Sequence, residues 1–226
     1  LYLTPKTRVC SFSHVSTITG LVMPLADISE LTKARDVLLV CDGAQAPGML
    51  DVDVRALRVD SYASSSHKWM LAPKGTGLLY IRKDVQDRIR PMFLESGFGA
   101  YTASSGTRSI ATILAHGVAM DFHDAIGRAK VAARCSELRV RLRGHLDEME
   151  GLTVLTPRDE ALCGGILTIS LDGGDYREVR RVLLEDHGFM LKNGKAEYNA
   201  IRISTHIFNN EDDVDRLAET LGGVLA

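Results

Sequence analysis

Short apolar segments alternate with amphipathic ones along the first part of the chain. The continuous apolar run at residues 37–41 (VLLVC) predicts a strand that is buried on both faces of a parallel sheet. Residues 8–13 (RVCSFS) predict an earlier strand, and residues 61–64 and 78–82 predict two later ones. A turn at residues 73–77, rich in Pro and Gly, separates the last two strands.

A helix is predicted between the strands at 8–13 and 37–41. Apolar residues recur there at helical spacing after Pro24, and two polar residues near its start are expected to cap it. The apolar positions are Leu25, Ile28, Leu31 and Ala34, and the expected caps are Asp27 and Ser29. Because strands and helices alternate in this way, we expect an α/β fold for this part of the chain.

The second half of the chain has a different pattern. One helix is indicated by apolar residues at helical spacing, namely Ile110, Ile113, Leu114, Val118, Ala119 and Phe122. A charged amphipathic helix at 129–149 follows, then a strand at 165–170, a helix at 176–187 and a strand at 200–204. A last helix begins at Asn210, where the sequence Asn-Glu-Asp-Asp is a predicted N-terminal cap. This α+β pattern predicts two domains, residues 1–105 and 106–226.

Composition and charge exclude several classes of protein. The chain has 27 Lys and Arg against 29 Asp and Glu, so its net charge of −2 gives no electrostatic footprint for nucleic acid or an anionic membrane surface. No apolar run approaches the roughly 20 residues of a bilayer span. The four cysteines show no spacing typical of a disulfide framework or a metal site. We therefore expect a reducing, cytoplasmic compartment and no metal.

Two segments place polar side chains directly after predicted strands. The first is Cys41-Asp-Gly-Ala-Gln45, and the second is Tyr62-Ala-Ser-Ser-Ser-His-Lys-Trp69, which is followed by the run PKGTG. The carboxyl ends of strands form the edge at which open α/β sheets bind ligands. Each segment also has a structural interpretation. Asp42 is a candidate turn or helix cap, the serines and His67 could satisfy local backbone groups, and the glycine-rich run could be a simple turn.

Taken in order, the blocks DGAQ, SSHKWMLAPKGTGLLYIRKD, SGTR and IRISTHIFNNEDDVDRL resemble the class V aminotransferase superfamily of pyridoxal-phosphate (PLP) enzymes. The HKW, PKGTGLLY and SGTR elements are most similar to its isopenicillin N epimerase-like branch, which is related to the cysteine desulfurase-like branch. The resemblance implies the PLP-dependent transferase fold type I. That fold has a mostly parallel large-domain sheet and a C-terminal α+β small domain.

The resemblance also implies roles for individual residues. Lys68 matches the lysine that forms the Schiff base with PLP and removes the Cα proton, for which its amine must be neutral. Asp42 matches the acid that pairs with the pyridine nitrogen, and Gln45 the residue that donates to the phenolic oxygen. Ser65 and His67 occupy positions that contact the phosphate.

Two further residues matched by the resemblance lie later in the chain. Thr107, in the pair Gly106-Thr107, matches a residue that reaches the phosphate in the neighbouring subunit, which implies a homodimer with shared active sites. Its structural interpretation is an N-cap for the helix that follows, and both interpretations can hold because a helix N-terminus binds anions. Arg202 matches the arginine that binds the α-carboxylate of the substrate, and its structural interpretation is a solvent-facing residue on an edge strand.

The chain departs from the family pattern at several places. The stretch 188–201, where cysteine desulfurases carry their nucleophilic cysteine, contains none, which disfavours persulfide transfer. Thr17 stands where many relatives have Asn, and we expect His14 to be structural. The chain starts at Leu1 without the phosphate cup and ring-stacking aromatic residue of the family. We therefore expect a partial chain with an exposed apolar face beside the strands at 8–13 and 37–41.

These observations favour a PLP-dependent enzyme that acts at Cα or Cβ of an amino acid through a Lys68 Schiff base. An epimerase or a carbon–sulfur or β-lyase is favoured, and a class V aminotransferase is the first alternative. A non-catalytic fragment or accessory module of the same fold is an alternative of another class. Retention of the six matched residues Asp42, Gln45, Ser65, His67, Lys68 and Arg202 argues against it.

Overall fold

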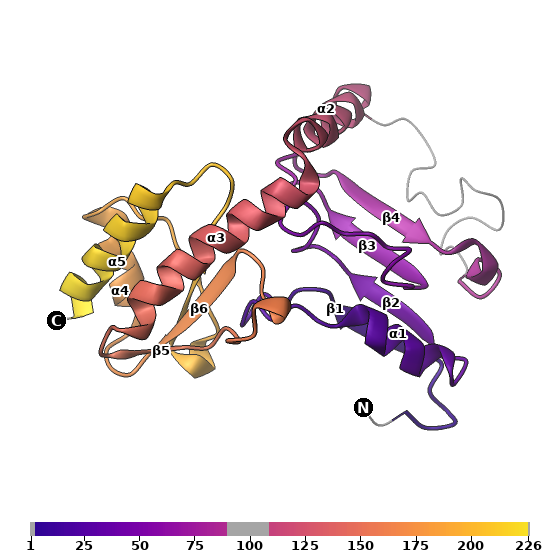
Figure 1. Cartoon of the computed structure of the whole chain (residues 1–226), viewed down its shortest axis with the longest axis horizontal. Coiled ribbons are helices and arrows are strands. Elements are labelled where there is room, and N and C mark those ends of the chain that lie inside the picture. The colour runs from indigo at the N-terminus through magenta and orange to yellow at the C-terminus, as the bar shows by residue number, and fades with distance from the viewer. Residues whose placement is uncertain (1–2, 90–108, 226) are drawn as a thin grey trace. The chain divides into compact units, whose positions relative to one another are not determined.

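The computed structural model describes residues 3–89 and 109–225. The chain forms two compact units (Figure 1). The first consists of residues 1–14 and 23–126, and the second of residues 15–22 and 127–226. The domain boundary predicted between residues 105 and 106 lies outside the described residues and stays a prediction.

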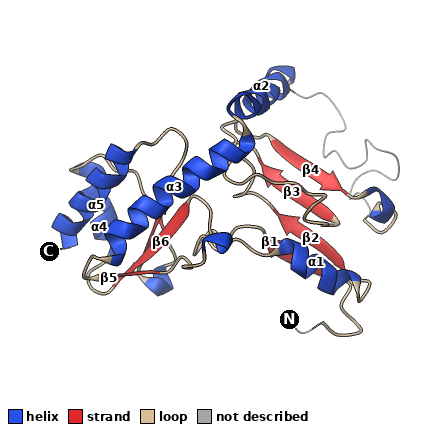
Figure 2. Cartoon of the chain, viewed as in Figure 1, coloured by secondary structure: helices blue, strands red, loops and turns tan. Residues whose placement is uncertain are grey.

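The first unit contains a four-stranded sheet in the order β1-β2-β3-β4 (Figure 2). Its elements are β1 (Val9–Ser13), α1 (Leu25–Lys33), β2 (Leu38–Asp42), β3 (Ser61–Ser65), β4 (Gly77–Ile81), the 3-10 helix Lys83–Val85, and α2 (Ile110–Ile126). Strands β1, β2 and β3 are parallel, and β4 is antiparallel to β3. The predicted α/β fold with a mostly parallel sheet is therefore confirmed.

The apolar run that predicted β2 forms the centre of this unit. Leu39 and Cys41 are buried and pack with Leu25 and Ile28 of α1. Parallel pairing places Asp42, the last residue of β2, opposite Ala63 of β3. The carboxyl ends of β2 and β3 therefore lie at one edge of the sheet, as parallel strands require.

The predicted caps of α1 are wrong. Its N-cap residue is Pro24, and no side chain caps the helix. Ser29 is buried instead and donates its hydroxyl to the backbone carbonyl of Arg58 at 2.7 Å. Asp27 lies in the first turn, where its carboxylate interacts favourably with the helix dipole.

The apolar side chains that predicted α2 lie mostly on its exposed side. Those of Ile110, Ile113, Leu114, Val118 and Phe122 are 48–71% exposed, whereas Ala119 and His123 are buried. We expected an exposed apolar face beside β1 and β2, and the structure does not show one on these strands. In those two strands Val9 is the one large apolar side chain that is exposed, at 51%. Among the described residues, α2 thus carries five of the exposed large apolar side chains of the first unit.

The second unit has an antiparallel sheet in the order β5-β6-β8-β7, with its helices on one side (Figure 2). Alternate residues of two strands, among them Leu167, Ile169 and Ile201, pack with apolar residues of the helices. This arrangement confirms the predicted α+β character. The elements are α3 (Arg128–Asp147), β5 (Leu152–Val154), β6 (Ile166–Leu171), α4 (Tyr176–Glu185), β7 (Lys192–Asn193), β8 (Ala200–Ser204) and α5 (Glu211–Leu225), with 3-10 helices at Glu160–Leu162 and Ala196–Tyr198.

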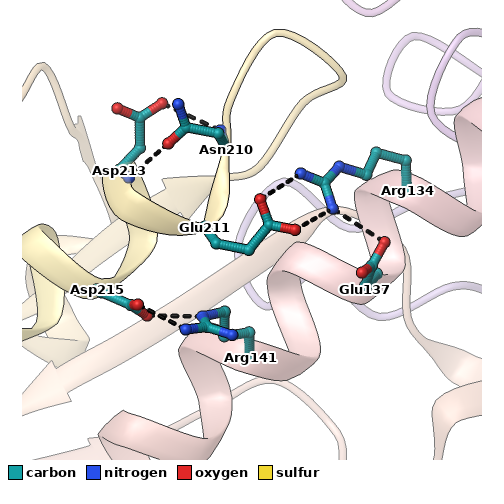
Figure 3. A network of polar contacts seen from close by, with 7 residues as sticks. All are labelled: Arg134, Glu137, Arg141, Asn210, Glu211, Asp213 and Asp215. Carbon is teal, nitrogen blue, oxygen red and sulfur yellow. Dashed lines mark hydrogen bonds and ion pairs between the residues drawn. The ribbon is translucent and has the colours of Figure 1, made fainter.

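The start of α5 is held by a cap and by ion pairs to α3 (Figure 3). Asp213 donates its backbone N–H to Oδ1 of Asn210 at 2.8 Å, and Asn210 N–H donates back to Oδ2 of Asp213 at 3.2 Å, so the predicted cap is confirmed. Arg134 of α3 binds both carboxylate oxygens of Glu211, at 2.7 and 2.8 Å. Within the described ranges no helix is long and apolar enough to cross a bilayer.

Candidate active site

The loop after β2 brings a carboxylate to the edge of the sheet. Gly43 donates its N–H to the carbonyl of Ala63 at 2.7 Å, and Ser64 Oγ donates to the carbonyl of Gly43 at 3.0 Å. Asp42 Oδ1 accepts the N–H of Ala44 at 2.8 Å, which is an Asx turn. One carboxylate oxygen of Asp42 therefore stabilises the turn, as the structural interpretation of this residue predicted. The side chain is exposed, although Cys41 beside it is buried.

The turn after β3 carries the predicted lysine. Ser66 N–H donates to the carbonyl of Thr76 at 3.0 Å, and Leu71 N–H donates to the carbonyl of Lys68 at 3.1 Å. Lys68 is half-buried and His67 is exposed. The hydroxyl of Ser66 is buried and has no hydrogen-bond partner within the described ranges. These backbone bonds confine the lysine to a short, closed turn.

An open cleft of about 440 Å³ lies between these two loops. Three of the predicted residues, Asp42, Ser65 and His67, line it together. Lys68 and Gln45 do not line it, although Lys68 directly follows His67 in the chain. The other lining residues are Ala44, Ala63, Ser64, Gly75, Thr76 and Gly77. The glycine-rich run, which was only a weak signal in the sequence, thus forms one wall.

The groups in the cleft suit a cofactor that carries a phosphate and a basic ring nitrogen. Its volume lies in the range of ~300–1,000 Å³ that is typical of small-molecule pockets. Ser65 and His67 can donate hydrogen bonds to phosphate oxygens, and Asp42 supplies a carboxylate for a protonated nitrogen. Gly77 is required at the wall because a Cβ there would lie 2.7 Å from the carbonyl oxygen of Ser64.

Gln45 is buried and does not line the cleft. Its Oε1 accepts the indole N–H of Trp69 at 2.8 Å. Trp69 follows Lys68 directly, so this bond joins the loop after β2 to the lysine turn. Local sequence patterns do not predict this contact, because the two residues are 24 positions apart.

His14 and Tyr62 form a buried pair next to the end of β2. His14 Nδ1 and the hydroxyl oxygen of Tyr62 are 2.8 Å apart, and His14 N–H donates to the carbonyl of Asp42 at 2.7 Å. Burial lowers the pKa of His14 to about 4 and, with the nearby Cys41 and Asp42, raises that of Tyr62. Both groups are therefore neutral near pH 7, which agrees with a structural role for His14.

Arg202 belongs to the second unit, on β8 between β6 and β7. It is half-buried on an interior strand, so the interpretation as a solvent-facing residue on an edge strand is wrong. Its Nη1 donates to the carbonyl of Thr17 at 3.4 Å, and its buried Nε has no partner in the described part of the chain. Burial lowers the pKa of the guanidinium. Thr107 lies outside the described residues.

The chain is similar to known proteins over most of its length. The family model described as "Aminotransferase class-V" matches residues 1–217. The chain is 36% identical over 238 residues to isopenicillin N epimerase of Amycolatopsis lactamdurans and 35% identical over 241 residues to that of Streptomyces clavuligerus. Each match covers 96% of this chain and 60% of the relative. A probable cysteine desulfurase of Halalkalibacterium halodurans is 28% identical, with 97% of this chain and 58% of the relative covered.

Solved structures share the fold. A C-DES mutant with glycine covalently linked to its PLP cofactor has a TM-score of 0.87 and 26% identity, with 97% of this chain and 61% of that one covered. An apo cysteine desulfurase of Thermococcus onnurineus NA1 has a TM-score of 0.85 at 23% identity, with 96% and 60% covered. The chain thus spans about 60% of the length of these relatives. Since the family model matches nearly the whole chain, this protein belongs to the aminotransferase class-V family.

Proposed function

We propose that the chain carries the lysine-bearing part of a PLP-dependent enzyme that acts at Cα or Cβ of an amino acid, as an epimerase or a carbon–sulfur or β-lyase. The observation that carries this proposal is the cleft in which Asp42, Ser65 and His67 meet, directly before Lys68 in the chain. Family membership and the PLP-containing neighbour support PLP as the cofactor. The identity of 35–36% to two isopenicillin N epimerases favours the epimerase or lyase type.

The three matched residues that line the cleft, and Lys68 directly after His67 in the chain, each have a defined task in this proposal. When bound, PLP supplies an electron sink for the carbon next to the amino group of the substrate. Asp42 would pair with the protonated ring nitrogen, and Ser65 and His67 would hold the phosphate. Lys68 would form the Schiff base and afterwards hold or move the proton of the substrate Cα.

Two residues outside the cleft complete the assignment. Gln45 would donate to the phenolic oxygen of the cofactor. Arg202 would bind the α-carboxylate of the amino acid, because a guanidinium can form two parallel hydrogen bonds to a carboxylate. Its buried and unpartnered Nε, together with the single long bond of Nη1, leaves donors that a carboxylate could take up.

The positions and the raised pKa values of the cysteines disfavour persulfide transfer of the desulfurase type. The stretch 188–201 has none. Burial raises the pKa of Cys41 to about 12 and that of Cys135 to about 11, and it also raises that of Cys163. Because a thiolate is the nucleophile, these three thiols are poorly suited to accept sulfur near pH 7. A class V aminotransferase remains the first alternative.

Two measurements test this proposal. The first locates the residue to which the cofactor attaches, and the second follows exchange of the substrate Cα proton with solvent. The chain is incubated with PLP, reduced with borohydride and mapped by mass spectrometry, and we expect the added mass on Lys68. Exchange of the Cα proton of L-amino acids in deuterated water is then followed by NMR. Both signals should disappear in Lys68→Ala and persist in Lys74→Ala, which removes an exposed lysine of the next turn.

The outcomes separate the proposals. Attachment at Lys68 without exchange of any amino acid would support the non-catalytic module and contradict the enzyme. Ultracentrifugation tests the homodimer with shared active sites that the Gly106-Thr107 match implies. The cytoplasmic location stays a prediction.

A further inference from the structure

Trp69 is the only tryptophan of the chain, and its side chain is 5% exposed. Its indole Nε1 donates a hydrogen bond to Oε1 of Gln45, at 2.8 Å, and Gln45 is 7% exposed. Trp69 lies one residue after Lys68, and Gln45 lies three residues after Asp42. A buried hydrogen bond thus joins the two segments that supply the lysine and the acid.

The chemistry of the indole determines which way the Gln45 amide faces. An indole N–H can only donate, so the carbonyl oxygen of the amide must face it. The remaining polar atom of Gln45 is the NH₂ group, which can only donate in turn. Among the described residues the structure gives this Nε2 no hydrogen-bond acceptor. Gln45 therefore presents a donor, and its natural partner is an oxygen atom with negative charge or lone pairs.

The backbone around this bond allows little adjustment. Gly48, with a φ of +90°, passes so close to the lysine turn that a Cβ would lie 2.3 Å from the carbonyl carbon of Trp69. Gly43 is tied to β3 by the two hydrogen bonds already described. His123 of α2 is buried near the backbone of Trp69 and Met70, and neither of its ring nitrogens has a hydrogen-bond partner in the described part of the chain. The tryptophan is therefore held independently of Gln45, so it can impose an orientation on the amide.

We propose that Trp69 is a positioning residue for the cofactor site, which holds the Gln45 amide with its NH₂ directed to the phenolic oxygen of PLP. This inference rests on the proposed function, because the phenolic oxygen belongs to that cofactor. A donor at this oxygen stabilises its anionic form and makes the neighbouring Schiff-base nitrogen less basic. Without Trp69 the amide is free to rotate, and the donor is lost for part of the time.

The test uses the full chain with PLP bound to Lys68, and follows the visible absorbance of the cofactor as a function of pH. In Trp69→Phe, which keeps an aromatic ring but lacks the N–H, we expect the midpoint of the spectral change to rise. The expected rise in the midpoint pH corresponds to a threefold to tenfold higher proton affinity of the Schiff-base nitrogen. Gln45→Met should raise the midpoint equally, and the double variant should add nothing, because both changes remove the same donor. Met70→Leu, a change of similar volume at the next buried position, should leave the midpoint unchanged.

A second measurement does not depend on the cofactor or on the folding of Trp69→Phe. Tryptophan fluorescence of the cofactor-free chain reports on Trp69 alone. Gln45→Met removes the acceptor of the indole and should shift the emission to shorter wavelength. Gln45→Glu keeps an acceptor and should leave the emission unchanged, while it still raises the cofactor midpoint because an ionised carboxylate cannot donate.

The failures of the two proposals are distinguishable. If the wild-type chain forms no absorbance band linked to Lys68, the proposed function fails, and the positioning role fails with it. If the band forms and Trp69→Phe leaves its midpoint unchanged, only the positioning role is wrong. Unchanged emission in Gln45→Met would also contradict it, because the indole would then not be bonded to Gln45. Additive shifts in the double variant would show that Trp69 acts through another contact.

Discussion

The ring of Tyr62 occupies the space that a side chain on Gly43 would need. A Cβ built on Gly43 would lie 2.0 Å from Cε1 of Tyr62 and 2.5 Å from its hydroxyl oxygen. Tyr62 is buried and its hydroxyl is bonded to His14, so the ring cannot withdraw without losing that contact. The turn that presents Asp42 therefore depends on a glycine directly after the acid.

Gly43→Ala should destabilise the chain and disturb the Asp42 turn. Overpacking of this kind costs ~1–3 kcal/mol in the free energy of unfolding. Urea unfolding measures the loss, and binding of PLP should weaken at the same time. Gly117→Ala in the middle of α2 is the matched control, because among the described residues nothing beyond the adjacent helix backbone lies within 4 Å of the added Cβ. That change should stabilise by up to ~1 kcal/mol. Equal stability of the two variants would contradict the close packing of Tyr62.

His14 should make stability depend on pH in the mildly acidic range. Burial lowers its pKa from 6.5 to about 4, so the unfolded chain binds a proton more readily between these values. Stability is therefore fully present above pH 6.5 and falls as the pH decreases toward 4. The loss is on the order of 3 kcal/mol. Urea unfolding between pH 7.5 and 4.5 measures it.

His14→Gln provides the control for this slope. Glutamine can still bond to Tyr62 but does not titrate, so the decline toward low pH should become shallower. A remaining slope is expected from His123, whose pKa is also lowered by burial. An identical slope in His14→Gln and the wild type would show that His14 is not buried in the neutral form.

The ion pairs between α3 and α5 should be visible in the titration of single carboxylates (Figure 3). Hydrogen bonds from Arg134 lower the pKa of Glu211 from 4.5 to about 2. A lowered carboxylate pKa contributes stability above pH 4.5, and that contribution is lost as the pH falls toward 2. In Arg134→Gln the NMR titration midpoint of Glu211 should return toward 4.5, while that of Asp215, held by Arg141, should stay near 2. Because these groups are exposed, high salt should reduce the shift.

Arg202→Lys should weaken the binding of an amino-acid substrate if Arg202 holds the carboxylate. Lysine keeps the charge but loses the planar pair of donors, so we expect KM to rise roughly tenfold to a hundredfold, with a smaller change in kcat. Steady-state kinetics with an amino acid that exchanges its Cα proton measure the two constants. Arg180→Lys changes another arginine of the second unit and should leave KM unchanged. An unchanged KM in Arg202→Lys would remove this residue from the site.

The elements of the fold were largely predictable because their signals are local. The apolar run of β2 and the helical spacing of α1 and α2 depend only on neighbouring residues. The short strands β5 and β7 were missed, since three and two residues carry no periodicity. The caps of α1 were misassigned because Ser29 finds its partner at Arg58, 29 positions away. The exposure of the apolar side of α2 could not be read from its spacing.

The sequence by itself determined the family, the parallel sheet and the presence of an acid and a lysine after neighbouring strands, because chain order and local patterns carry that information. Only the tertiary structure decided that Asp42, Ser65 and His67 line one cleft while Gln45 is buried and does not line it. The pairing of Trp69 with Gln45, and of Tyr62 with His14, joins residues 24 and 48 positions apart. Such contacts follow from how buried strands and loops fill space together, and no local pattern records them.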